Sequence, residues 1–228
     1  MSDLRADFEG VDLWIFDLDN TLYPRPETLW ARFDPRMTAF VSDALEVDLA
    51  EAHRVQKDYL VRYGTTLKGL IEHHDVEPRA FLDDVHDVAL TEIEPNPALA
   101  DAIYALPGRK IIHTNAVRSH AERVLARLDI PESHFGAIYD IEFTKYESKP
   151  HPHAYDIVMG AEDRDPARAA FFEDSARNLL EPHKRGMRTI FVPTDCALAS
   201  DGSEGAHIHF TAHDLTSFLH ELREEVRA

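Results

Sequence analysis

Cysteine is nearly absent from this sequence, because Cys196 is the only one among 228 residues. A single thiol excludes an intrachain disulfide bond and a metal site built from several cysteines. Apolar runs long enough to cross a bilayer are also absent. The first residues, 1–5, lack the basic and apolar regions of a secretory signal. We therefore expect a cytoplasmic protein that does not span a membrane.

Positive charge is scarce as well. Acidic residues number 42 against 24 lysines and arginines, which leaves a formal net charge of −18. Such an excess disfavours binding to nucleic-acid polymers and to anionic membranes. A small anionic substrate would therefore need local cations at its site: a metal ion, a lysine or the N-terminus of a helix. The oligomeric state stays open at this point.

Six short apolar stretches rich in β-branched residues predict strands. They are residues 11–16, 110–113, 137–141, 169–172, 189–192 and 207–210. Most of them are separated by segments with helical periodicity, which are residues 120–128, 153–159, 179–185 and 215–226. Strands that alternate with helices predict an α/β fold with a parallel sheet covered on both faces.

Residues 23–93 interrupt this alternation. They contain no convincing strand but four amphipathic stretches, at residues 28–45, 50–63, 67–74 and 79–90. The insert leaves the core directly after the first predicted strand, so we expect it to lie over the carboxyl end of that strand as a lid. The expected domains are a core formed by residues 1–22 and 94–228 and a helical cap formed by residues 23–93.

The motif Asp17-Leu18-Asp19-Asn20-Thr21 directly follows the first predicted strand. Open α/β sheets place their chemistry at the carboxyl ends of their strands. One carboxylate, Asp17, can attack a phosphorus atom while the other, Asp19, transfers a proton. These roles require Asp17 to stay ionised and Asp19 to hold a proton more easily. Three further polar pairs follow in order, each beside a predicted strand: Thr114-Asn115, Lys149-Pro150 and Glu173-Asp174.

The residue types in these pairs suit phosphoryl transfer. A phosphomonoester dianion repels a carboxylate, so Mg²⁺ is expected to neutralise charge, with Asp174 as the second protein carboxylate on the metal. Lys149 supplies a point charge to the phosphate and to Asp17. Thr114 and the backbone at Asn115 end a strand and open a helix, which is a site suited to an anion.

These four elements resemble the motifs of the haloacid dehalogenase-like (HAD) superfamily. The resemblance rests on Asp17–Thr21, His113-Thr114-Asn115, Lys149-Pro150 and Phe172-Glu173-Asp174-Ser175. It implies that Asp17 is the nucleophile and Asp19 the acid/base. It also implies that Mg²⁺ is held by the side chain of Asp17, the backbone carbonyl of Asp19 and an acid of the fourth motif. Asp174 is expected in that role, whereas Glu173 reaches the metal either directly or through water.

The same resemblance refines the fold and the reaction. It implies a Rossmann-like three-layer parallel sheet sandwich with an inserted all-helical cap domain of the kind called C1. The presence of Asp19 argues against a dehalogenase, whose chemistry lacks that second aspartate. The resemblance therefore implies hydrolysis of a small phosphorylated substrate.

Longer sequence words resemble the pyrimidine 5′-nucleotidase branch of this superfamily. These words are Leu22-Tyr23-Pro24 and residues 63–70, 95–99 and 149–155. They imply a pyrimidine nucleoside 5′-monophosphate as substrate. Thr65 and Thr66 are expected to donate to an anion or a ribose, and Tyr23 and Tyr63 to contact the base, with Tyr63 at the edge of the cleft. Two alternatives stay open: another small phosphomonoester, such as a sugar phosphate or nicotinamide mononucleotide, and a non-catalytic phosphate-binding module.

Overall fold

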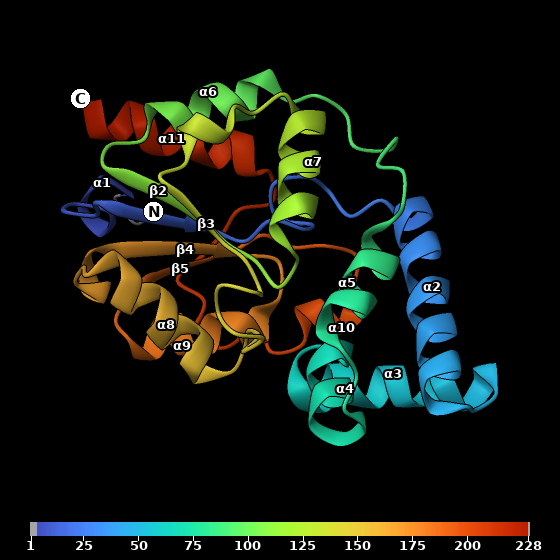
Figure 1. Ribbon diagram of the computed structural model, residues 1–228. Coiled ribbons are helices and arrows are strands. Elements are labelled where there is room, and N and C mark those ends of the chain that lie inside the picture. The colour runs from blue at the N-terminus through green and yellow to red at the C-terminus, as the bar shows by residue number, and fades with distance from the viewer. Residues whose placement is uncertain (1–3, 228) are drawn as a thin grey trace.

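A six-stranded parallel sheet forms the centre of the molecule (Figure 1). The computed structural model describes the backbone of residues 4–227. The strands lie in the order β3-β2-β1-β4-β5-β6. Their bounds are β1 (Leu13–Phe16), β2 (Arg109–His113), β3 (Ala137–Tyr139), β4 (Ala169–Glu173), β5 (Arg188–Phe191) and β6 (Phe210–Thr211).

Helices cover both faces of the sheet and give it three layers. In Figure 1, α6, α7 and α11 lie on one face, and α8 and α9 lie on the other. Successive side chains of a strand point to opposite faces. Trp14 and Phe16 of β1 therefore pack in one core cluster with residues of α6, α7 and α11, and Leu13 and Ile15 pack in a second cluster with residues of α8. The expected α/β, Rossmann-like sandwich is confirmed.

The helices outside residues 23–93 are short to medium in length. Their bounds are α1 (Leu4–Asp7), α6 (Pro97–Ala105), α7 (Arg118–Leu128), α8 (Pro152–Glu162), α9 (Leu180–Lys184), α10 (Ala197–Ser200) and α11 (Leu215–Arg227). Within the part of the chain that the structure describes, no helix is both long enough and apolar enough to cross a membrane.

Five of the six predicted strands are present in the sheet, with ends within two residues of the prediction. The sixth, predicted at residues 207–210, is wrong at its start, because β6 begins only at Phe210. The residues before it bond to Thr189 of β5 in another way. The Thr189 hydroxyl donates to the His207 carbonyl (2.7 Å), and the Thr189 N–H donates to Nδ1 of His209 (3.1 Å). The ring of His209 thus takes the place of a backbone acceptor in the expected strand pairing.

Residues 23–93 contain four helices and no strand among their described residues. The helices are α2 (Glu27–Leu45), α3 (Leu49–Tyr63), α4 (Thr66–His74) and α5 (Pro78–His86). Three of them begin at a side chain that accepts from a backbone N–H of the first turn, namely Asp48, Thr65 and Glu77. In Figure 1 these helices lie beside one end of the sheet. The predicted helix 79–90 ends four residues early, where Arg123 binds the carbonyls of His86 and Val88.

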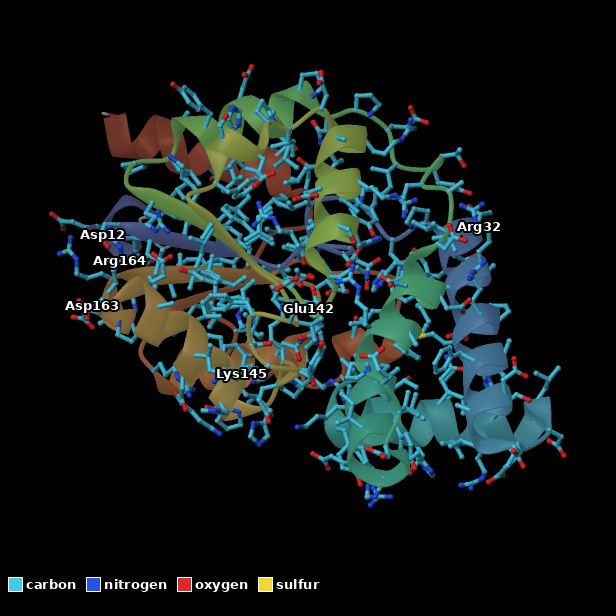
Figure 2. All side chains as sticks on the ribbon, in the orientation of Figure 1. Asp12, Arg32, Glu142, Lys145, Asp163 and Arg164 are labelled. Carbon is cyan, nitrogen blue, oxygen red and sulfur yellow. The ribbon has the colours of Figure 1, made fainter. Side chains whose placement is uncertain are left out.

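Charged side chains connect this helical insert to the core. Arg79 of α5 donates to both carboxylate oxygens of Glu142 (2.9 and 2.8 Å), which follows β3. Within the insert, Arg32 of α2 forms a two-pronged pair with Glu92, near the end of the insert (2.6 Å for each bond). Figure 2 shows Arg32 on the outer helix of the insert and Glu142 near the centre of the molecule, beside the insert. Both pairs are partly exposed, so each contributes little to stability, but the Arg79–Glu142 pair restricts the position of the insert on the core.

Candidate active site

The carboxyl ends of β1, β2 and β4 bring predicted site residues to one edge of the sheet. Asp17 follows β1, Thr114 follows β2, and Glu173 ends β4. The parallel pairing continues one residue past β1, because the Asp17 N–H donates to the Phe172 carbonyl (2.9 Å). This backbone bond holds the Asp17 carboxylate next to the end of β4.

Lys149 reaches this edge from the loop between β3 and α8. Its side chain is 1% exposed. Its ammonium group donates to Oδ1 of Asp17 (2.7 Å), to Oε2 of Glu173 (2.7 Å) and to the carbonyl of His113 (2.8 Å). A buried charge is tolerated when it is paired and fully hydrogen-bonded. Burial lowers the pKa of Lys149, but Asp17 and Glu173 raise it more strongly, so the ammonium stays protonated.

Three buried carboxylates form a cluster around this ammonium. Asp17, Glu173 and Asp174 each place an oxygen within 4.8 Å of the others. Burial and the charge of Glu173 raise the pKa of Asp17 to about 7, against the effect of Lys149. Burial and the charges of Glu173 and Asp17 raise the pKa of Asp174 well above its usual value. One ammonium therefore does not balance three acids. The imbalance and the oxygen donors fit a hard divalent cation such as Mg²⁺.

Both oxygens of Glu173 are bonded within the protein, as are both oxygens of Asp17, which accept from Lys149 (2.7 Å) and from the Thr21 hydroxyl (3.0 Å). Oε2 of Glu173 accepts from Lys149, and its Oε1 accepts from the side-chain amide of Asn178 (3.1 Å) and the N–H of Ser175 (3.3 Å). Asp174 accepts no such bond among the described residues, so it is the carboxylate of the three that fits direct contact with a metal best. Glu173 fits the alternative in which it acts through water.

Asp19 has a different environment from Asp17. Burial raises the pKa of Asp19, but the charge and hydrogen bond of His120 and the hydroxyl of Tyr23 lower it further, to about 2. His120 Nε2 lies 2.8 Å and the Tyr23 hydroxyl 2.5 Å from Asp19 Oδ1. The two pKa values therefore lie in the opposite order to the one expected. Asp19 is the stronger acid because His120 contacts it, and Asp17 is the weaker acid because other carboxylates crowd it.

Thr114 and Asn115 use their side chains inside the protein. The Thr114 hydroxyl accepts from the N–H of Ala116 (3.0 Å). The Asn115 amide bonds to the backbone of Lys149. Arg118, the first residue of α7, donates its N–H to Asp140 (2.8 Å). One N–H at the start of α7 is thus already bonded to Asp140, and the side chain of Asn115 positions the backbone of Lys149.

A cavity of about 530 Å³ lies over these residues, between the core and the insert. Its floor includes Asp17, Asp19 and Lys149, and its opposite wall includes Thr65 and Thr66. The Thr65 hydroxyl accepts from the N–H of α4 at Lys68, and the Thr66 hydroxyl donates to the carbonyl of Gln56. The acidic cluster therefore opens into a space between the two parts of the chain.

Tyr23 and Tyr63, which were expected to contact the nucleotide base, are not among the described residues that line this cavity. Tyr23 is 4% exposed, and its hydroxyl is bonded to Asp19. The Tyr63 ring packs edge-on against Tyr59, and its hydroxyl bonds to His73 (2.6 Å). The expectation that Tyr63 faces the cleft is therefore not met, because its side chain is directed toward His73 in the last turn of α4.

Other cavity residues were not expected from the sequence. Three aromatic residues of α2 and α5 contribute to the lining, namely Trp30, Phe33 and Phe81. Charge on the insert side comes from Lys57, which forms an ion pair with Asp34 (2.6 Å). All five lie in helices whose apolar periodicity predicts only packing. Their positions in the cavity depend on how the helices pack, which periodicity does not reveal.

Comparison with known proteins agrees with this geometry. Phosphate metabolism protein 8 of Saccharomyces cerevisiae is 25% identical over an alignment 193 residues long that covers 77% of this chain and 59% of that protein. The chain thus spans less than two thirds of the length of this relative. The structure of CbbY from Rhodobacter sphaeroides in complex with phosphate has a TM-score of 0.61 and 22% identity, over 88% of this chain and 93% of that one.

A dehalogenase shares the same fold. L-2-haloacid dehalogenase from Xanthobacter autotrophicus has a TM-score of 0.56 and 16% identity, over 94% of this chain and 99% of that one. At such identities, the similarity of the structures shows the fold alone. A family model for haloacid dehalogenase-like hydrolases matches residues 11–180, which is more than half of the chain. The chain belongs to the haloacid dehalogenase-like hydrolase family.

Proposed function

We propose that this protein is a Mg²⁺-dependent phosphomonoester hydrolase that acts through a phosphorylated Asp17. The observation that supports this proposal best is the floor of the cavity. There the carboxylate of Asp17 is held by a fully bonded lysine, and Asp19 lies two residues further along the chain. A phosphate-binding module has no need for that second carboxylate.

The reaction takes place in two steps. An oxygen of Asp17 attacks the phosphorus atom, the ester P–O bond breaks, and Asp19, which must carry a proton on Oδ2 at this step, donates it to the departing oxygen. Water then attacks the phosphorus atom and gives a proton to Asp19, which frees inorganic phosphate and regenerates Asp17. Lys149 holds Asp17 in place and stabilises negative charge on the transferred group.

Asp17 and Asp174 would hold the metal with their side chains, and Asp19 with its backbone carbonyl. Bound there, Mg²⁺ neutralises phosphate charge and polarises its oxygens. Glu173 supports this arrangement from behind, because it binds Lys149 and the amide of Asn178.

Residues 23–93 serve as a cap domain that selects the substrate, and the core is formed by residues 1–22 and 94–228. The wall opposite Asp17 presents Trp30, Phe33 and Phe81 to the cavity. Aromatic faces bind a planar base by stacking, which is worth about 1–3 kcal/mol per base. A cavity of about 530 Å³ with this wall fits a nucleotide with one ring. A pyrimidine nucleoside 5′-monophosphate is therefore the proposed substrate.

The test is phosphate release from a panel of esters. The panel comprises UMP, CMP, AMP, GMP, sugar phosphates, nicotinamide mononucleotide and an aryl phosphate, each with Mg²⁺ and with excess chelator. We expect the highest kcat/KM for UMP or CMP, and no turnover with chelator or in Asp17→Asn. A sugar phosphate that outperforms UMP would overturn the pyrimidine assignment alone. Absence of turnover on every ester would overturn the phosphatase itself.

A further inference from the structure

The carboxylate of Asp19 is anchored through one of its two oxygens. Oδ1 accepts from the Tyr23 hydroxyl (2.5 Å) and from Nε2 of His120 (2.8 Å). Within the described chain, no hydrogen bond is recorded to Oδ2, and the Asp19 side chain is 24% exposed at the cavity. Two donors on one oxygen fix the rotation of the carboxylate and leave the other oxygen available for proton transfer.

His120 belongs to α7 in the core, 101 positions away from Asp19 in the sequence, and its side chain is 1% exposed. Nε2 is engaged with the carboxylate, so the other ring nitrogen, Nδ1, needs a partner of its own. That atom is buried and has no partner among the described residues. An unpaired buried nitrogen is unfavourable, and an apolar residue would fill this position without that cost. The contact with Asp19 is what the histidine adds.

The ring of His120 is held from the other side by the insert. The centroid of Phe33, from α2, lies 5.9 Å from that of His120, with the rings nearly perpendicular at 82°. The centroid of His86, from α5, lies 4.6 Å away. Nδ1 of His86 is itself 2.9 Å from the carbonyl of Leu82, which fixes the orientation of that ring. Two insert helices thus pack on the core side chain that hydrogen-bonds to Asp19.

We propose that His120 is a positioning residue that orients Asp19 for proton transfer, and that Phe33 and His86 of the insert hold it there. The proposal rests on the proposed role of Asp19. It means that the position of α2 and α5 affects the acid/base as well as the shape of the cavity. Without His120, Tyr23 alone would hold Asp19, from the same loop, and the carboxylate would rotate more freely.

The test compares esters that differ in their need for a proton. Dinitrophenolate leaves without protonation, whereas the alkoxide of UMP does not. In His120→Leu we expect kcat for UMP to fall about 100-fold, the scale of general acid catalysis, with KM changed by less than about threefold. With dinitrophenyl phosphate, we expect a rapid burst of dinitrophenolate, at a rate within about threefold of wild type, followed by slow turnover.

Three comparisons complete the experiment. His120→Gln keeps a nitrogen donor at a similar reach, so its kcat for UMP should be at least about tenfold higher than that of His120→Leu. His86→Leu should show the pattern of His120→Leu at smaller amplitude. His134→Leu removes another ring with a buried unpaired Nδ1, outside the cavity, and should behave as wild type.

Two outcomes would overturn the proposal. One is unchanged UMP turnover in His120→Leu. The other is an equal fall in the burst rate with dinitrophenyl phosphate and in kcat for UMP, without rescue by His120→Gln. That result would assign a purely structural role to His120. If His120→Leu does not fold, a His120→Gln protein that loses the burst and UMP turnover equally also overturns it. A wild-type protein that hydrolyses no ester would instead contradict the proposed function.

Discussion

The side chain of Asn115 and the backbone of Lys149 form a reciprocal pair of hydrogen bonds. The Asn115 amide group donates to the Lys149 carbonyl (3.1 Å), and the Lys149 N–H donates to the Asn115 amide oxygen (2.9 Å). The two residues follow different strands and lie 34 positions apart. This pair fixes the backbone from which the lysine extends to Asp17.

Asn115→Asp should therefore damage the site through Lys149. The substitution keeps the acceptor and places a negative charge against the Lys149 carbonyl. We expect kcat/KM to fall at least about tenfold, and the free energy of unfolding to fall by about 1–3 kcal/mol. Steady-state kinetics and urea unfolding measure the two effects. Asn178→Asp is the control, because it disturbs the bond to Glu173 and leaves the pair between Asn115 and Lys149 intact. Retention of full activity in Asn115→Asp would show that the pair does not position the lysine.

Asp174→Asn and Glu173→Gln should separate metal binding from support. Asp174 fits direct contact with the metal, so its variant should require at least about tenfold more Mg²⁺ for half-maximal activity. Glu173 is bonded to Lys149 and Asn178, so its variant should lower thermal stability more than it alters the Mg²⁺ requirement. Titration calorimetry with Mg²⁺ gives a readout independent of turnover. Equal shifts in both variants would place Glu173 on the metal itself.

The Asp34–Lys57 pair in the cavity wall should control the KM of anionic substrates. Lys57 donates to both oxygens of Asp34 (2.6 and 2.7 Å). Lys57→Met leaves an unbalanced negative charge, so KM should rise about three- to tenfold with little change in kcat. Asp34→Asn should lower KM. Both effects should weaken at high ionic strength. Lys184→Met removes a surface lysine paired with Glu181 and should leave KM unchanged. Shifts of the same sign in the two wall variants would contradict this electrostatic role.

Glu162 should stabilise the fold in a pH-dependent way. Its carboxylate, whose side chain is 1% exposed, accepts two bonds from Arg109 and one from the Tyr139 hydroxyl (2.7 Å). Burial raises the pKa of Glu162, but the bonds to Arg109 and Tyr139 outweigh this and lower it. A carboxyl whose pKa is lower in the folded than in the unfolded state stabilises above its unfolded pKa. That stabilisation is lost as the pH falls through the folded pKa.

Glu162→Gln should therefore cost about 1.5–3 kcal/mol near pH 7 and much less at pH 3. Urea unfolding at pH 7, 5 and 3 measures the difference. Glu51→Gln breaks an exposed pair with Arg54 and should change the free energy of unfolding little at any of these values. A constant difference between wild type and Glu162→Gln across this range would rule out the linkage.

The sheet could be predicted because parallel strands are buried on both faces. Stretches such as Leu13–Phe16 are consequently almost wholly apolar, with polar residues directly after them. Helix α6 was not predicted, because its apolar residues show no clear stripe. Its start was nonetheless marked, since the Asn96 side chain accepts from the N–H of Leu99 and Pro97 occupies the first turn.

The site could be predicted only where it follows strands. Asp17 and Asp174 come directly after β1 and β4, so a parallel sheet places them together. His120 could not be placed, because it lies in α7 among apolar residues that predict only a buried face. Tyr63 illustrates a similar limit. A small rotation of α3 decides whether its ring faces the cavity, and helical periodicity does not resolve such a rotation. Their functional roles stay predictions.

The ion pair between Lys149 and Asp17 also has a consequence for folding. Its partners are 132 positions apart, and Glu173, the third member, arrives only with β4. Loop closure over such separations is slow compared with the local contacts that form helices. The nucleophile therefore acquires its cation only after the central strands have paired. A chain that refolds from denaturant is expected to recover its helical circular dichroism before its catalytic competence, so that turnover reports the last long-range step of assembly.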